Sequence, residues 1–169
     1  MEIKSQFENR GKTYKVTYRD EDPNTNLNGS TLYGVHAYCF YKDKLVVVSN
    51  SQKLWSPPGG AIEKGETYEE AIIREVKEEA NMKVIYHQYI GYQDVWFEDG
   101  QFMSRQARSF CIVEPYGYFE SDPDGDIFEI KLIDPKDYRE YIIWGKVGDH
   151  LMMRALEIYE KYKNNLIKT

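Results

Sequence analysis

Cysteine is scarce in this chain of 169 residues, which contains only Cys39 and Cys111. The two thiols are far apart in the sequence and form no Cys-x-x-Cys pair. The pattern therefore excludes both a zinc site built on such pairs and a disulfide framework. Two isolated cysteines are expected to be buried and reduced, as is usual for proteins of the cytoplasm.

Long apolar runs and basic clusters are missing as well. No segment approaches the roughly 18 consecutive apolar residues of a membrane span, and residues 1–6 lack the apolar stretch of a secretory signal. These absences predict a cytoplasmic protein with no membrane partner. The net charge is −6, from 28 acidic and 22 basic residues, which argues against a duplex nucleic-acid partner.

The length suits one domain, because domains commonly have about 100–200 residues. Alternation of apolar and polar residues predicts strands at 12–18, 32–40, 45–49, 83–92, 105–114 and 127–133. We expect a tight turn at Asp43-Lys44 and a short helix from Asp134-Pro135 to about Tyr141. The order predicts one α+β domain over 1–169, with a core at about 31–165 and an N-terminal strand extension at 1–30.

Two longer helices are expected. Thr67 and Glu70 have the spacing of a capping box, and the helix that they open should end at Ala80, with Asn81 in the left-handed position that follows a helix. The second helix is predicted to run from a cap at Asp149 to about residue 163.

The first of these helices carries an unusual acidic arc. At about 100° per residue, one arc contains the apolar residues Ile72, Ile73, Val76 and Ala80, which should face the core. The neighbouring arc contains Glu75, Glu78 and Glu79 within one turn. Like charges at this spacing repel, and the C-terminal end of a helix disfavours anions. The arc is either a solvated acidic face or an oxygen-ligand site for a hard divalent cation such as Mg²⁺.

The segment before this helix favours the cation site. The sequence Trp-Ser-Pro-Pro-Gly-Gly at 55–60 fixes the approach of the chain, and its glycines allow the backbone to come close to a metal or phosphate. The whole stretch resembles the Nudix box, Gly-x5-Glu-x7-Arg-Glu-hydrophobic-x-Glu-Glu-x-Gly-hydrophobic. The matching positions are Gly60, Glu66, Arg74, Glu75, Val76, Glu78, Glu79 and Met82. The one departure is Asn81 in place of the last glycine, and Asn also tolerates the left-handed conformation.

The resemblance implies a Nudix α/β/α sandwich, in which a mixed sheet carries the catalytic helix and a C-terminal helix. It implies that Glu75, Glu78 and Glu79, with help from the Gly60 carbonyl, bind Mg²⁺, for which Mn²⁺ is an expected substitute. Glu66 would pair with Arg74 and orient the catalytic helix, and the planar guanidinium suits that task.

The implied reaction is attack of water on phosphorus in a nucleoside diphosphate linked to another group. Glu78 or Glu79 is the first choice of general base, and a glutamate from a later loop is the alternative. Those later candidates are Glu98, Glu120 and Glu129. Candidates for contact with the substrate are Trp55, Trp96 and Arg105, with Arg108 as another cation able to meet a phosphate; exposed solubilising charges are the plainer interpretation of both arginines.

The sequence lacks the additional marks outside the box that accompany cleavage of ADP-ribose, diadenosine polyphosphates, NADH or coenzyme A. A small MutT-like enzyme acting on nucleoside triphosphates, including oxidised or non-standard ones, is therefore the expectation. The alternative is a non-catalytic Nudix-fold module that binds a nucleotide metabolite. A homodimer is expected at the level of the family only. The acidic loop at 121–126 has the wrong glycine and glutamate positions for an EF-hand, and a solvated turn is expected there.

Overall fold

The computed structural model describes residues 1–27, 31–118 and 127–166. Its strands are β1 (Glu2–Asn9), β2 (Lys12–Arg19), β3 (Leu32–Tyr41), β4 (Lys44–Asn50), β5 (Trp55–Ser56), β6 (Met82–Phe97), β7 (Phe102–Pro115) and β8 (Ile127–Ile133). Its helices are α1 (Tyr68–Ala80), the 3-10 helix η1 (Pro135–Glu140) and α2 (Gly145–Leu166). None of the described helices is long and apolar enough to cross a membrane.

The strands form one mixed sheet with the order β1-β2-β6-β7-β3-β4-β5, and β8 pairs with β4. Only β3 and β7 run parallel; the other described pairs are antiparallel. The ladder between β3 and β4 contains just two residue pairs, next to the turn at Lys42-Asp43. Beyond those pairs the two strands separate, and the gap is filled by the loop that leads to α1.

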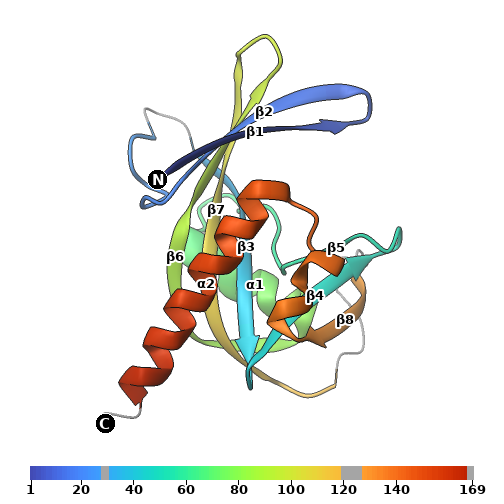
Figure 1. The fold of residues 1–169 in the computed structure, drawn as a ribbon, viewed down its shortest axis with the longest axis vertical. Helices are drawn as coiled ribbons and strands as arrows, with labels where there is room; N and C mark the ends of the chain where they lie inside the picture. The colour runs from blue at the N-terminus through green and yellow to red at the C-terminus, as the bar shows by residue number, and fades with distance from the viewer. Residues whose placement is uncertain (28–30, 119–126, 167–169) are drawn as a thin grey trace.

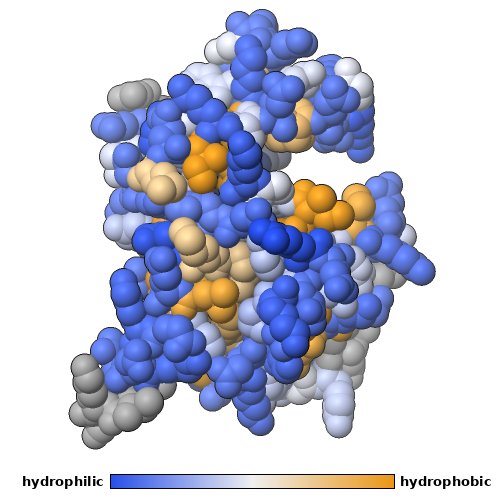
Figure 2. Space-filling model, viewed as in Figure 1, coloured by the Kyte–Doolittle hydropathy of each residue, from blue (hydrophilic) through white to orange (hydrophobic). Residues whose placement is uncertain are grey.

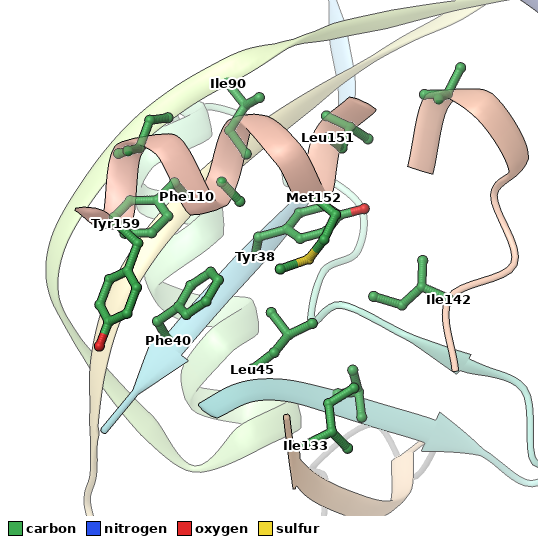
Figure 3. Close-up of a cluster of buried hydrophobic side chains, with 14 of the residues drawn as sticks. Tyr38, Phe40, Leu45, Ile90, Phe110, Ile133, Ile142, Leu151, Met152 and Tyr159 are labelled. Carbon is green, nitrogen blue, oxygen red and sulfur yellow. The ribbon is translucent and has the colours of Figure 1, made fainter. Parts of the chain in front are cut away.

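The two long helices cover opposite faces of the sheet, with α2 in front and α1 behind in the view of Figure 1. The α1 face is packed with small and branched side chains, among them Val35, Ala37, Ala71, Ile72 and Val76. The α2 face is larger and more aromatic, and Figure 3 shows Tyr38, Phe40, Phe110 and Tyr159 packed between the sheet and the helix. This two-sided burial confirms the predicted sandwich of a mixed sheet between helices.

Several boundaries differ from the prediction. Helix α2 begins at Gly145 and not at Asp149: the Gly148 amide already donates to the Trp144 carbonyl at 3.2 Å, and the Asp149 carboxylate contacts Tyr138 and Arg139 of η1. It continues to Leu166, past the predicted end. On α1, Ile73 is 46% exposed, so it does not belong to the core arc, while Ile72 and Val76 are fully buried.

The N-terminal segment adds a hairpin to the edge of the sheet. β1 pairs with β2 along its whole length, and β2 pairs with the far half of β6. The end of β2 is tied to α2 through Asp20, whose carboxylate accepts from the Tyr18 hydroxyl at 2.8 Å and lies 2.8 Å from His150 Nε2. This contact joins the N-terminal hairpin, at the edge of the sheet, to the N-terminal part of α2.

Candidate active site

Along the N-terminal half of β3, the loop before α1 forms the backbone hydrogen bonds that a neighbouring strand would form. The Val35 amide donates to the Gly60 carbonyl and the Ala37 amide donates to the Pro58 carbonyl, each at 2.9 Å. A Cβ at Gly59 would lie 2.1 Å from the Val35 carbonyl oxygen, so only glycine fits at that position. The close approach leaves the Gly59 amide free of the sheet, and it donates to Oε2 of Glu79 at 2.8 Å.

Gly60 and Glu75 are also tightly packed against each other. A Cβ on Gly60 would lie 2.4 Å from Oε1 of Glu75, closer than any real contact. Glu75 is 8% exposed, which makes it a buried carboxylate at the base of the acidic arc. A carboxylate is expensive to bury unless other groups neutralise its charge, so this position indicates a local source of positive charge.

Arg74 supplies part of that charge. Its guanidinium holds Glu66 by two parallel hydrogen bonds, Nε to Oε1 at 2.9 Å and Nη2 to Oε2 at 3.0 Å. The other terminal nitrogen, Nη1, donates to Glu75 at 2.8 Å and to Glu78 at 3.1 Å. Nη2 also donates to the Ala61 carbonyl at 2.9 Å, which fixes the loop on the helix.

These contacts shift the acid–base equilibria of the cluster. The hydrogen bond from Arg74 lowers the pKa of the Glu66 carboxyl, and the amide of Glu63 adds to that effect. The same hydrogen bond, together with the bonds to Glu75 and Glu78, raises the pKa of Arg74 further above its ordinary range. Glu66 and Arg74 are therefore both charged at neutral pH, and they connect the loop to the helix as an ion pair.

The donor set of the arc fits a hard divalent cation. Three carboxylates and a loop carbonyl are the oxygen ligands that Mg²⁺ takes in proteins, and a single guanidinium does not balance four acidic groups. Within the described part of the chain, no three acidic, His or Cys side chains converge as closely as a coordination sphere requires. Glu78 is turned to Arg74, and Glu79 is turned to the Gly59 amide.

The capping interactions that position this helix agree with the prediction. The Thr67 hydroxyl accepts from the Glu70 amide at 3.2 Å, and Glu70 accepts from the Thr67 amide at 2.8 Å. Asn81 adopts the left-handed conformation, with φ of 49°, where the box pattern has glycine. The departure from the pattern therefore leaves the end of the helix intact.

The two predicted aromatic contacts lie in different places. Trp55 is half-buried on β5, edge-on to Tyr141 at 5.4 Å, with Nζ of Lys131 4.6 Å from its ring centre. Trp96 lies near the end of β6, where it lines a cavity of about 460 Å³ together with Arg105. No residue of the box lines that cavity.

Arg105 and Arg108 are not exposed solubilising charges, since they are 5% and 2% exposed. Arg105 is held by Asp94 through two hydrogen bonds of 2.7 Å and 2.9 Å and stacks on Tyr92 at 3.7 Å. The alternation of residues along β7 could not reveal the burial of Arg105, because the loop that follows the N-terminal hairpin contacts it, with the Pro23 and Thr25 carbonyls accepting from Nη1.

The later glutamates that the structure describes lie apart from each other. Glu98 is exposed at the turn between β6 and β7, and Glu129 is exposed on β8, where it lies 3.6 Å from Lys131. Glu120 and the acidic loop at 121–126 lie outside the described residues. The sequence did not single out the Gly59 amide, which the structure shows to orient the Glu79 carboxylate. The feature that pointed to it is the pair of glycines after two prolines.

Comparison with known proteins identifies a family. The model of the NUDIX domain matches residues 31–154. The Bacillus subtilis pyrophosphohydrolase BsRppH, solved as a glutamate-to-alanine mutant, is 19% identical with a TM-score of 0.71, covering 90% of this chain and 96% of that one. A NUDIX hydrolase from Nitrosomonas europaea is 20% identical with a TM-score of 0.55, covering 79% and 91%. A MutT structure from a study of the enzyme in Aliivibrio salmonicida and Vibrio cholerae is 18% identical with a TM-score of 0.52, covering 75% and 98%.

At these identities the solved structures support the fold. A search of curated proteins by sequence returned no significant match.

Proposed function

The chain belongs to the Nudix family of hydrolases, and we propose that it cleaves the diphosphate linkage of a nucleoside diphosphate derivative. A nucleoside triphosphate, including oxidised or non-standard ones, is the leading substrate class. Support comes from the acidic arc of α1 and from the likeness in fold to proteins named as a pyrophosphohydrolase and as MutT. A cytoplasmic location and a homodimer are part of the same proposal.

We assign the binding of Mg²⁺ to Glu75, Glu78 and Glu79, with the Gly60 carbonyl as a further donor. The bound ion would activate the attacking water and neutralise charge on the phosphate oxygens. The buried Glu75 is fixed by its contact with Gly60, so it provides a rigid ligand at the base of the site. Glu78 and Glu79, at the more open end of the arc, are partly exposed and accessible to substrate.

The chain's own groups perform the remaining steps. Glu78 or Glu79 would take the proton from the attacking water, because both lie within one turn of Glu75. Arg74 and Glu66 act as positioning residues, since they join the loop to the helix and keep the carboxylates in a fixed arrangement. Trp55, Trp96 and Arg105 remain proposals for contact with the substrate.

The single observation that carries this function is the burial of the Glu75 carboxylate against a glycine that admits no side chain. A solvated acidic face would not bury one of its charges or require that glycine. The rival function, a binding module that does not cut its ligand, is less well supported, because every acidic position of the box is retained.

A substrate panel tests the proposal. Purified protein with Mg²⁺ would be offered nucleoside triphosphates, nucleotide sugars, ADP-ribose and dinucleotides, with release of phosphate and pyrophosphate measured. We expect turnover of at least one nucleoside triphosphate, and the ratio of the two products identifies the phosphorus that is attacked. Tight binding of a nucleotide without turnover of any compound would favour the binding module.

A further inference from the structure

Arg108 is a buried cation, and the described residues that contact it carry no negative charge. It is 2% exposed, and its guanidinium donates to the Gln106 side-chain oxygen at 2.8 Å and to the Ala107 carbonyl at 3.1 Å. Its Nη1 lies 3.5 Å from His36 Nδ1, and its Cζ lies 5.2 Å from the centre of the Trp144 ring. Its buried Nε has no hydrogen-bond partner, and no salt bridge to Arg108 is present among the described residues. Arg105, three residues earlier on β7, is paired with Asp94 instead.

An unbalanced charge of this kind opposes folding. Burial lowers the pKa of Arg108 to about 10, which leaves the guanidinium charged at neutral pH. Burial, followed by the charge of Arg108, lowers the pKa of His36 to about 3, so the imidazole stays neutral and offers no counter-charge. A buried charge that is not matched within the protein is a mark of a functional site, where a ligand can supply the missing acceptors.

Arg108 lines a cavity of about 260 Å³ on the α2 face of the sheet. Phe7 of the N-terminal hairpin lies on one side, and Trp144 and Val147 at the start of α2 lie on another. Figure 2 shows the molecule hollowed between that hairpin and the body below it. The carboxamides of Gln93 and Gln106 also line the cavity and offer both donors and acceptors. A lining that combines aromatic and aliphatic side chains with two carboxamides and a guanidinium suits a heteroaromatic ring.

The cavity adjoins the acidic arc through the gap between β3 and β4. His36 lines the cavity, and its Cα lies so close to Gly59 that a Cβ there would be 2.7 Å away. The Gly59 amide in turn contacts Glu79 at 2.8 Å. The backbone at Gly59 therefore lies between a residue that lines the cavity and a carboxylate of the arc.

We propose that this cavity holds the base of the substrate and that Arg108 selects a 6-oxopurine, the guanine or hypoxanthine type of base. The inference rests on the proposed function and adds its base preference. A guanidinium can donate two hydrogen bonds to the O6 and N7 acceptors of such a base. Adenine presents an amino donor at the same place, which would face the donors of Arg108 and leave them unpaired.

A phosphate group fits the cavity less well than a base. Phosphate sites in proteins collect several cations or backbone amides, whereas here one guanidinium stands among aromatic, aliphatic and carboxamide groups. Phe7, which stacks on Tyr14, and Trp144, whose ring packs against the Arg108 guanidinium, add aromatic lining that favours a base over a phosphate.

The test is calorimetric titration with nucleoside monophosphates in EDTA, since these contain no diphosphate linkage and the ion-dependent contacts are removed. GMP and IMP are expected to bind roughly 10- to 100-fold more tightly than AMP. Arg108→Met should remove that preference while changing the affinity for AMP little. Arg108→Lys keeps the charge but loses the planar pair of donors, so it should also lose most of the preference. Phe7→Leu, a change to an aromatic side chain of the lining that packs on Tyr14, should weaken GMP and AMP alike and keep their ratio.

Equal affinity of the unaltered protein for GMP and AMP would overturn the inference, and so would a preference for GMP that survives in a folded Arg108 variant. A third contrary result is that inorganic phosphate displaces GMP from the unaltered protein but not from the Arg108 variants. If neither Arg108 variant folds, the GMP-to-AMP ratio decides: a preference for GMP in both the unaltered protein and Phe7→Leu supports the inference, and equal affinities overturn it. Hydrolysis of triphosphates without base preference would refute this inference alone. A GMP preference in a chain that hydrolyses no compound of the panel would refute the proposed function alone.

Discussion

The carboxylate of Glu75 lies so close to Gly60 that residue 60 has no room for a side chain. A Cβ on residue 60 would lie 2.4 Å from Oε1 of Glu75. The backbone of the loop and the side chain of the helix are thus fitted to one another before any ligand binds. A carboxylate buried in this way keeps a fixed direction, which a metal ligand requires.

This contact gives the first prediction. Gly60→Ala forces Glu75 out of its position, so turnover should fall on the order of 100-fold. The free energy of unfolding should fall by about 1–3 kcal/mol, from overpacking. Gly117→Ala is the matched control, because Gly117 has open space around its Cα and no positive φ, and it should leave both quantities unchanged. Activity of Gly60→Ala equal to that of the control would contradict the assigned role of Glu75.

The second prediction concerns the other two carboxylates of the arc. Glu78→Gln and Glu79→Gln preserve shape and remove charge, so each should reduce kcat by roughly 10²–10⁴-fold, the range expected for loss of a general base or ligand. The melting temperature should change little, because like charges at this spacing repel. Glu69→Gln, the same change in the first turn of the helix, should leave kcat intact. A variant with full activity removes its residue from the site.

Arg74 should matter for both stability and turnover. Arg74→Ala leaves Glu66, Glu75 and Glu78 without their shared partner, and we expect a loss of about 1–3 kcal/mol in unfolding free energy. Arg74→Lys keeps one charge but cannot hold Glu66 at two points, so it should recover stability more than turnover. Equal recovery of both quantities by lysine would show that charge alone, without the planar geometry, is sufficient. Urea unfolding and steady-state kinetics on the same preparations measure the two effects.

Divalent cations should stabilise the folded chain. Addition of Mg²⁺ to protein treated with EDTA should restore activity and raise the melting temperature, with about 2.7 kcal/mol of stabilisation at a hundredfold excess over Kd. Glu75→Gln should abolish most of that thermal shift, whereas Glu69→Gln should keep it. If addition of Mg²⁺ changes neither the melting temperature nor the activity, the metal site is ruled out.

The Glu66–Arg74 pair predicts a particular pH dependence. Because Arg74 lowers the pKa of Glu66 in the folded state, the contribution of Glu66 to stability is complete above the ordinary carboxyl pKa of about 4.3 and disappears as the pH falls through the lower folded pKa. The difference in unfolding free energy between the unaltered protein and Glu66→Gln should therefore be constant from pH 7 to about pH 5 and shrink below it. A difference that grows toward acid pH would have the wrong sign for this ion pair.

The sequence by itself determined the acidic helix and its ends. Thr67, Glu70 and Asn81 are local signals, since each acts within one turn of its own position, and the structure has the capping box and the left-handed residue where they were expected. The pairing of Glu66 with Arg74 was implied by the resemblance to the Nudix box, and the structure contains it. The strands with a buried, apolar face were predicted for the same reason, although β6 and β7 extend further than their apolar alternation indicates.

Only the tertiary structure decided the features that depend on contacts between distant segments. β1 has almost no buried side chains, so its sequence carries no apolar pattern, and pairing with β2 alone makes it a strand. Asp149 has the residue type of a helix cap, yet its carboxylate contacts Arg139 of η1, and α2 begins at Gly145. Arg105 and Arg108 look alike in the sequence, but one meets Asp94 and the other lines a cavity without a carboxylate. The burial of a charge and the identity of its partner are set by how strands and helices pack, and no local pattern contains that information.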